Sequence, residues 1–315
     1  MNPLSALFGA GVSVRNALYD RGRLCPRRLP APVISVGNLS LGGAGKTPFV
    51  MALGELLKAR GIEFDVLTRG YGRRSRGATQ VDPAGSARQF GDEPLLIARR
   101  LGVPVFVSEK RYEAGVLAER TLGPRLHVLD DGFQHRQLAR DFDIVLVTPE
   151  DAHGRLLPVG RMRESLRALR RADAIVLTPD GVFPDLPLTD KRVWQVRRGI
   201  CPERVPPRPV AFCGIARPQR FFSQLREAGI QPAAEAGFRD HHAYTLRDIA
   251  RLLNLKRQAG AEGFVTTEKD AINLGILADS LQPLAIVPVT MELVEAQTAI
   301  DAMLAIIAER RGANL

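Results

Sequence analysis

A glycine-rich segment that ends in Gly-Lys-Thr is the part of this 315-residue sequence with the clearest chemistry. Residues 39–48 read Leu-Ser-Leu-Gly-Gly-Ala-Gly-Lys-Thr-Pro. They follow the apolar, β-rich run 32–37 and precede residues 49–58, whose apolar spacing is helical. A strand, a glycine-rich turn, Gly-Lys-Thr and a helix, in this order, form a phosphate-binding P-loop. The sequence therefore predicts a binding site for a nucleoside triphosphate.

The side chains and backbone of this segment have distinct predicted roles. Lys46 can reach the terminal phosphates, and the Thr47 hydroxyl is placed to ligate Mg²⁺. Backbone amides of the turn and of the helix start point at the phosphates. The residues expected to bind the nucleotide are Gly42, Gly43, Ala44, Gly45, Lys46 and Thr47. The alternative is an ordinary glycine-rich turn with a surface lysine.

Two carboxylates, Asp130 and Asp131, stand where the apolar run 126–130 ends. In P-loop enzymes an aspartate at a strand end near the P-loop holds or orients the Mg²⁺. Ligands of doubly wound sheets also sit at the carboxyl ends of the strands. We therefore expect one or both aspartates to serve the metal, the alternative being that they cap the next helix.

Asp92 and His241 are two further candidates, although each has an ordinary explanation when taken alone. Asp92 precedes a predicted helix, where an N-cap aspartate is common. His241 and His242 follow Asp240, and a histidine pair in such a loop is usually structural. Adjacent side chains point apart and no third ligand is evident, which argues against a metal site there. Spacing along the chain cannot connect Asp92 to His241.

Arg161, Arg163 and Glu164 follow a turn after residue 157. Arginines near a P-loop can stabilise the charge of a transferring phosphoryl group, but a basic loop is an equally good explanation. Residues 267–270, Thr-Glu-Lys-Asp, are weakly similar to the base-reading motif of GTPases.

The elements that must position these residues are apolar strands alternating with helices, which is typical of a parallel sheet covered on both faces. We expect an α/β fold: a P-loop NTPase-like parallel-sheet domain over residues 1–190 and a smaller α/β domain over 210–315, with its last helix starting at Met291. The proline- and arginine-rich stretch 191–209 is expected to be a linker and a hinge. The predicted strands lie at residues 62–68, 103–107, 126–130, 142–147 and 174–178 in the first domain, and at 209–214, 263–267 and 284–289 in the second.

The charge indicates an anionic partner, since 44 Lys and Arg oppose 34 Asp and Glu. Nucleic acid, an anionic membrane surface and a phosphorylated substrate all satisfy it. Residues 3–19 can form a helix with one apolar face, and arginines follow it. Such a helix fits an anionic membrane surface as well as it fits packing on its own domain.

The order of these motifs resembles the tetraacyldisaccharide 4'-kinase family, the lipid A kinases of Gram-negative bacteria. Its most specific part is the combination of the P-loop with Gly-Asp-Glu-Pro and Asp-Asp-Gly-Phe-Gln-His. The matching segments are 36–38, 42–48, 69–72, 91–94, 129–135, 158–164, 240–241 and 267–270.

The resemblance implies transfer of the γ-phosphoryl group of ATP, with Mg²⁺, to the 4'-hydroxyl of a tetraacylated glucosamine disaccharide 1-phosphate. It implies that Asp92 accepts or orients the hydroxyl proton and that His241 pairs with Asp92. Gln134, Arg161 and Glu164 are implied around the metal and the γ-phosphate. It further implies a peripheral protein on the cytoplasmic face of the inner membrane, whose N-terminal helix contacts lipid.

Two other classes are less consistent with the sequence. A regulatory GTPase or metallochaperone needs a better base-reading motif or Cys/His metal spacing. A nucleic-acid-dependent ATPase fits the charge, but the arginines lack interleaved aromatic residues. We expect no nucleic-acid partner and no obligate protein partner.

Overall fold

The computed structural model describes residues 2–178, 183, 186 and 191–312, and its larger unit is built on a mostly parallel sheet. Within the described residues nine strands follow the order β13-β8-β7-β6-β1-β5-β2-β4-β3, parallel except for β13 and β3 at the two edges. The strands are β1 (Val33–Asn38), β2 (Phe64–Thr68), β3 (Thr79–Gln80), β4 (Val105–Val107), β5 (Leu126–Asp130), β6 (Phe142–Val147), β7 (Ala174–Leu177), β8 (Arg192–Ile200) and β13 (Val289–Leu293).

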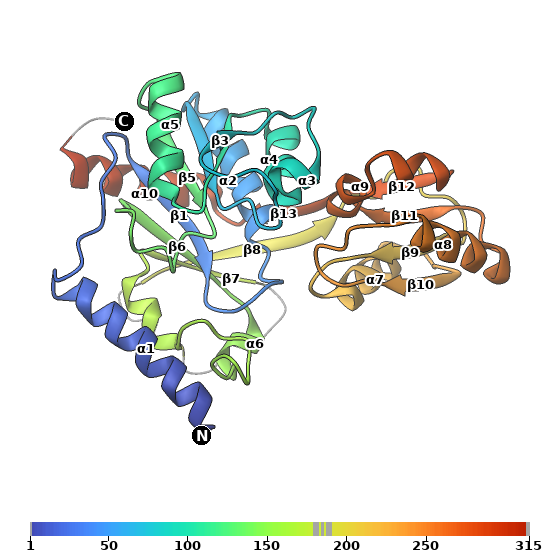
Figure 1. Ribbon diagram of the computed structural model, residues 1–315, viewed down its shortest axis with the longest axis horizontal. Coiled ribbons are helices and arrows are strands. Elements are labelled where there is room, and N and C mark those ends of the chain that lie inside the picture. The colour runs from blue at the N-terminus through green and yellow to red at the C-terminus, as the bar shows by residue number, and fades with distance from the viewer. Residues whose placement is uncertain (1, 179–182, 184–185, 187–190, 313–315) are drawn as a thin grey trace.

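Helices cover both faces of this sheet because its central strands are apolar on both sides (Figure 1). Along β6, Phe142, Ile144 and Leu146 enter one core, whereas Val145 and Val147 enter the opposite one. The first face carries α2 (Lys46–Ala59), α4 (Asp92–Leu101) and α10 (Ala296–Arg311), and the second carries α5 (Arg111–Leu122) and the 3₁₀ helix η1 (Leu166–Arg171). The short helices α3 (Ala87–Phe90) and α6 (Pro149–Ala152) lie in connections.

A smaller unit lies beside this sheet and has its own parallel sheet, in the order β10-β9-β11-β12 (Figure 1). Its core centres on Phe212, whose ring makes edge contacts with Tyr244 and Phe264. Its elements are β9 (Val210–Cys213), α7 (Pro218–Glu227), β10 (Ala234–Gly237), α8 (Leu246–Ala259), β11 (Phe264–Thr267), α9 (Glu268–Leu274), η2 (Gly275–Ser280) and β12 (Leu284–Val287).

The expected linker over 191–209 is wrong for its first half. Arg192–Ile200 is the strand β8, which pairs with β7 and then with β13. Charge misled the prediction, since Arg192 and Arg197 are exposed while Trp194 and Val196 are buried, and Trp194 stacks on Phe142. Among the described residues, the chain passes between the two units after β8 and again between β12 and β13. Part of the expected linker boundary, residues 187–190, falls outside the described residues.

The end of the chain also belongs to the larger unit rather than to the second domain. Residues around Met291 are the strand β13, because Met291 and Leu293 face the core while Glu292 is exposed. The last helix, α10, begins five residues later and buries Ile300 and Ile307 in the large core. The chain therefore leaves the larger unit after β8 and returns to it with β13.

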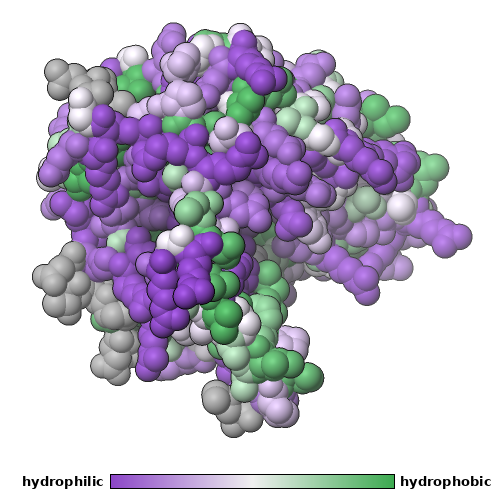
Figure 2. Space-filling view, turned by 60° about the vertical axis from the view of Figure 1, so that its left-hand side comes forward, coloured by the Kyte–Doolittle hydropathy of each residue, from purple (hydrophilic) through white to green (hydrophobic). Residues whose placement is uncertain are grey.

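The N-terminal helix α1 (Pro3–Asp20) lies along the outside of the larger unit and is held mainly by polar contacts. The Ser5 hydroxyl donates to the Leu156 carbonyl at 2.9 Å, and Arg136 binds Asp20. Leu7 and other apolar side chains remain exposed, and Figure 2 shows hydrophobic surface gathered on the projecting N-terminal end. Among the described residues, no helix is both long and apolar enough to cross a membrane.

Candidate active site

The P-loop has the backbone conformation that its glycines predict, and it lines a cavity of about 550 Å³ at the carboxyl edge of the large sheet. Gly45 caps α2 with φ of 87°, in the left-handed region that favours glycine. A side chain on Gly43, whose φ is 74°, would also collide with Arg217. All six predicted nucleotide-binding residues line this cavity.

Lys46 begins α2 and points back to the ends of β1 and β5. Its Nζ donates to Asn38 Oδ1 at 3.0 Å and lies 3.5 Å from Asp131 Oδ1. Arg163 binds both oxygens of Asp131, at 3.0 and 2.8 Å, and also contacts the Asn38 side chain. Burial alone would raise the pKa of Asp131, but Lys46 and Arg163 hold it well below its usual range. The lysine, the arginine and the carboxylate therefore form one charged group beside the P-loop.

Asp130 lies deeper than Asp131, and one of its oxygens lacks a protein partner. Its Oδ2 accepts from the Thr68 hydroxyl at 3.3 Å, whereas its buried Oδ1 has no hydrogen-bond partner among the described residues. Burial, with Glu93 and Asp131 nearby, raises the pKa of Asp130 to about 7. A divalent cation would favour the ionised carboxylate, and oxygen ligands such as Asp130 and Thr47 suit Mg²⁺. The residues present therefore fit the expected metal.

Asp92 and His241, 149 residues apart, are in direct contact across the two units. Asp92 is the first residue of α4 and is 4% exposed. The Nδ1 of His241 lies 3.0 Å from Asp92 Oδ1 and 2.9 Å from Oδ2. His241 is held at φ of 57°, a left-handed conformation that is uncommon for residues other than glycine and that clusters at functional sites. The resemblance paired these two residues, and the structure brings them together.

The pair is asymmetric, because His241 lines the cavity and Asp92 does not. Burial alone would raise the pKa of Asp92, but the hydrogen bond from His241 and the charge of Lys269 bring it down to about 2. Burial would lower the pKa of His241, but its bond to Asp92 raises the value overall. Asp92 is therefore a buried anion, and His241 lines the P-loop cavity.

Two residues of α9 that the sequence reasoning did not assign to this pair complete its surroundings. Asn273 donates to Asp92 Oδ2 at 3.0 Å, and Lys269 Nζ lies 3.2 Å from His241 Nε2. The neighbouring Asp270 is turned inward and accepts from the Gly214 amide at 2.7 Å, next to the carbonyl that His241 N contacts. The segment 267–270 therefore positions the His241 loop, and its Lys269 reaches the cavity.

The three remaining predicted residues lie in different places. Gln134 donates to the Asn38 carbonyl at 2.9 Å, beneath the P-loop. Arg161 donates to the Leu41 carbonyl at 2.7 Å and so braces the start of the loop. Glu164, expected near the metal and γ-phosphate, does not line the P-loop cavity: it is buried between Asn16 of α1, at 2.6 Å, and Arg171, at 3.0 Å.

Arg69, Arg111 and His135, which the sequence reasoning did not place in the site, lie near Asp131 and Arg163. Arg111, the first residue of α5, is buried; its Nη1 donates to the Glu109 carbonyl at 2.8 Å and its Nε has no partner among the described residues. Burial, together with Arg69 and Arg163, lowers the pKa of Arg111 despite the opposing effect of Asp131. Burial and Arg111 also lower the pKa of His135 to about 4, so His135 is neutral near pH 7.

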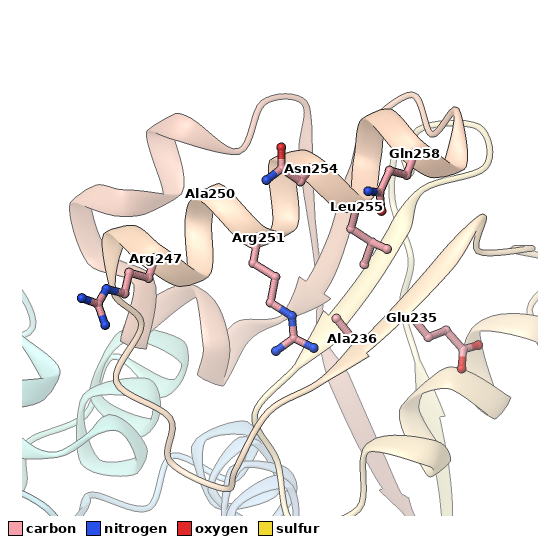
Figure 3. A pocket seen from close by; sticks show the side chains of 8 residues that line it. All are labelled: Glu235, Ala236, Arg247, Ala250, Arg251, Asn254, Leu255 and Gln258. Carbon is pink, nitrogen blue, oxygen red and sulfur yellow. The ribbon is translucent and has the colours of Figure 1, made fainter.

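A second pocket, of about 540 Å³, lies on the smaller unit away from the P-loop, between α8 and β10. Figure 3 shows Arg251 reaching into it from α8 towards Ala236. None of the predicted site residues lines it.

Comparison with known proteins gives one family. The model of the tetraacyldisaccharide-1-P 4'-kinase family matches residues 1–308. A tetraacyldisaccharide 4'-kinase of Koribacter versatilis is 51% identical over 322 residues, covering 99% of this chain and 100% of that protein. One of Aquifex aeolicus is 41% identical over 289 residues, covering 86% and 88%. The solved structure of LpxK from Aquifex aeolicus in complex with ATP superimposes with a TM-score of 0.80 at 36% identity, covering 97% of this chain and 98% of that one.

Proposed function

Because the chain belongs to the tetraacyldisaccharide-1-P 4'-kinase family, it is an ATP-dependent phosphotransferase of lipid A biosynthesis, and we propose a role for each side chain of its site. The reaction moves the γ-phosphoryl group of ATP to the 4'-hydroxyl of a tetraacyldisaccharide 1-phosphate. The oxygen of that hydroxyl bonds to the γ-phosphorus, the bond to the bridging oxygen of ADP breaks, and the hydroxyl proton must go to a base.

Lys46 and the amides of the P-loop bind the phosphates in this proposal. Thr47 and Asp130 hold the Mg²⁺, which when bound neutralises charge on the phosphates. Arg163 keeps Asp131 ionised beside Lys46 and is a candidate for stabilising the transferring group. Two observations support Asp130 as the metal ligand. Its buried Oδ1 has no hydrogen-bond partner among the described residues, whereas Asp131 already pairs with Lys46 and Arg163.

His241 accepts the proton, and Asp92 holds the imidazole. This reverses the roles expected from the sequence, because Asp92 is buried away from the cavity and its low pKa makes it a weak base. A carboxylate bound to Nδ1 orients the ring and stabilises the imidazolium that forms, leaving Nε2 for the hydroxyl. The observation that carries this assignment is that His241 lines the cavity while contacting Asp92 through Nδ1 alone.

Arg69 and Arg111, with the neutral His135 beside them, suit the 1-phosphate of the acceptor. The group is close to α1, since the positive charge of Arg15 on α1 also lowers the pKa of His135. Arginine is well suited to bidentate binding of phosphate.

Replacing Arg111 with Met is therefore expected to raise the KM for the lipid about 10- to 100-fold, the effect of losing a hydrogen bond to a charged group, with little change in the KM for ATP. Steady-state kinetics with each substrate varied in turn measures this. The exposed neighbour Lys110, changed to Met, is the matched control. Equal effects on both KM values would contradict a role in lipid binding.

The exposed apolar face of α1 is the surface we propose to enter the cytoplasmic leaflet of the inner membrane. Leu4, Leu7 and Val14 are all at least 60% exposed and share one helix face at spacings of three and seven residues. A helix of this kind lies in the interface with its apolar side among the acyl chains.

Replacing Leu7 with Glu is expected to weaken binding to anionic vesicles at least about 10-fold, because it removes a buried leucine from the interface and adds a charge. Co-sedimentation with phosphatidylglycerol-containing vesicles measures this. Leu7 is 73% exposed, and Leu246 on the smaller unit is 74% exposed, so Leu246→Glu is the matched control. Equal loss in both variants, or none in either, would remove α1 from the membrane contact.

The activity itself is tested with γ-labelled ATP, Mg²⁺ and a tetraacyldisaccharide 1-phosphate in detergent micelles. Label is expected at the 4' position of the lipid. Label released only as inorganic phosphate would contradict the proposed use of the site.

A further inference from the structure

Lys269 is the cation in contact with His241, the proposed base. Phosphate binding is already assigned to Lys46, so the position of Lys269 needs another explanation. Its Nζ lies 3.2 Å from His241 Nε2, 3.1 Å from Asp240 Oδ1 and 3.4 Å from Glu93 Oε1. It is also 3.9 Å from Asp92 Oδ2. Burial alone would lower the pKa of Lys269, but these carboxylates hold it above its usual range, so the side chain is an ammonium group.

The two neighbours of the imidazole determine which nitrogen carries its proton. Asp92 is ionised and can only accept a hydrogen bond, so Nδ1 of His241 must donate. The Lys269 ammonium can only donate, so Nε2 must accept. The ring is therefore neutral with its proton on Nδ1, and its lone pair on Nε2 faces the cavity side. This is the tautomer that a base at Nε2 requires.

Charge around the ring gives Lys269 a second effect. The ionisable groups facing His241 are Asp92 and Glu93 of α4, Asp240 of its own loop and Lys269 of α9, with Tyr71 against the ring face. Three carboxylates favour a protonated imidazole, and an imidazolium cannot accept a proton. The ammonium group opposes them from 3.2 Å.

We propose, on the basis of the function proposed above, that Lys269 is a positioning residue that keeps His241 neutral in the Nδ1–H tautomer and yields Nε2 to the acceptor hydroxyl. When the hydroxyl arrives, the ammonium gives up one hydrogen bond and retains Asp240 and Glu93. Before the acceptor binds, Lys269 therefore makes the hydrogen bond to Nε2 that the acceptor hydroxyl makes during transfer.

Replacing Lys269 with Met is expected to raise the pH midpoint of His241 titration by about one to three pH units, because the carboxylates then act unopposed. The full-length protein with ¹⁵N-labelled histidine reports this midpoint and the tautomer by NMR, with the His241→Gln spectrum assigning the signals. The acid limb of kcat/KM should move to higher pH by the same amount, so that activity lost near pH 6.5 returns at higher pH.

Two controls distinguish this charge effect from a purely structural role, in which Lys269 would only connect the two units through Glu93 and Asp240. Lys269→Arg keeps the charge and should leave the midpoint near its wild-type value. Arg100→Gln breaks the 2.8 Å ion pair with Glu268 across the same α4–α9 contact and should do likewise. If the Met variant does not fold, Lys269→Gln takes its place.

An unchanged His241 midpoint in the neutral variant, or an equal shift in Arg100→Gln, would overturn the proposal. The NMR readout needs no turnover. Normal phosphate transfer together with a His241 titration midpoint that does not depend on Lys269 would therefore contradict this inference alone. Absence of label in the lipid would instead contradict the proposed function.

Discussion

Replacing His241 with Gln is expected to lower kcat for lipid phosphorylation by about 10²–10⁴-fold, the usual contribution of a general base. Gln cannot accept the proton at the position of Nε2, while binding of ATP at the P-loop, on the other unit, is retained. Single-turnover transfer at saturating ATP and lipid measures the effect on the chemical step.

His242 provides the matched control for this prediction. It is adjacent to His241, but its Nε2 lies 3.1 Å from Asp248 in the capping box of α8, away from Asp92. His242→Gln should therefore leave the transfer rate within about threefold of wild type, because it changes a contact of the α8 cap and ring packing on Phe238, both away from the P-loop cavity. Equal losses in the two variants would mean that the loop, and not the imidazole, carries the effect.

Replacing Lys46 with Ala is expected to reduce transfer by about 10²–10³-fold and to weaken ATP binding. An ammonium group aimed at the terminal phosphates stabilises charge that develops on them, and removing one such donor typically costs about 2.7–4 kcal/mol. Burst kinetics for transfer and equilibrium titration with a non-hydrolysable ATP analogue separate the two effects.

Lys58, near the other end of the same helix, is the control for this change. Its Nζ donates to the Leu101 carbonyl at 2.9 Å, and it also pairs with Glu55. Lys58→Ala should leave both measurements at wild-type values. A Lys46→Ala enzyme with unaltered transfer would exclude Lys46 from the reaction.

The parts of the site that are local in sequence were predicted correctly. The P-loop could be predicted because its glycines, its lysine and the following helix are contiguous, and the structure places all of them at the cavity. Asp130 likewise ends a strand next to β1, as the apolar run before it predicted.

Contacts between distant segments could not be predicted in this way. Only the family resemblance linked Asp92 to His241, since 149 residues separate them and no local pattern reports their contact. Lys269 and Asn273 escaped assignment for the same reason. Glu164 was predicted near the metal together with the adjacent arginines. Its neighbour Arg163 does point to Asp131, but the side chain of Glu164 turns the other way, to Asn16 of α1.

The fold shows the same division. Continuous apolar strands predicted the parallel sheet, but the arginines of β8 concealed a strand whose alternate residues are buried. The return of β13 and α10 to the larger unit depends on pairing Met291 with Arg198 across a gap of 93 residues along the chain. No local composition indicates such a pairing.

The pH dependence of kcat/KM at saturating ATP tests the central claim, that His241 is the proton acceptor held by Asp92. Its bond to Asp92 raises the pKa of His241, and the neutral ring is the active form, so the wild-type rate should rise with pH through that pKa. In Asp92→Asn the acid limb should move to lower pH, because the carboxylate that stabilises the imidazolium is gone. In His241→Gln the limb should be absent, leaving a low rate that does not change over this range. The same limb persisting in His241→Gln would contradict the account.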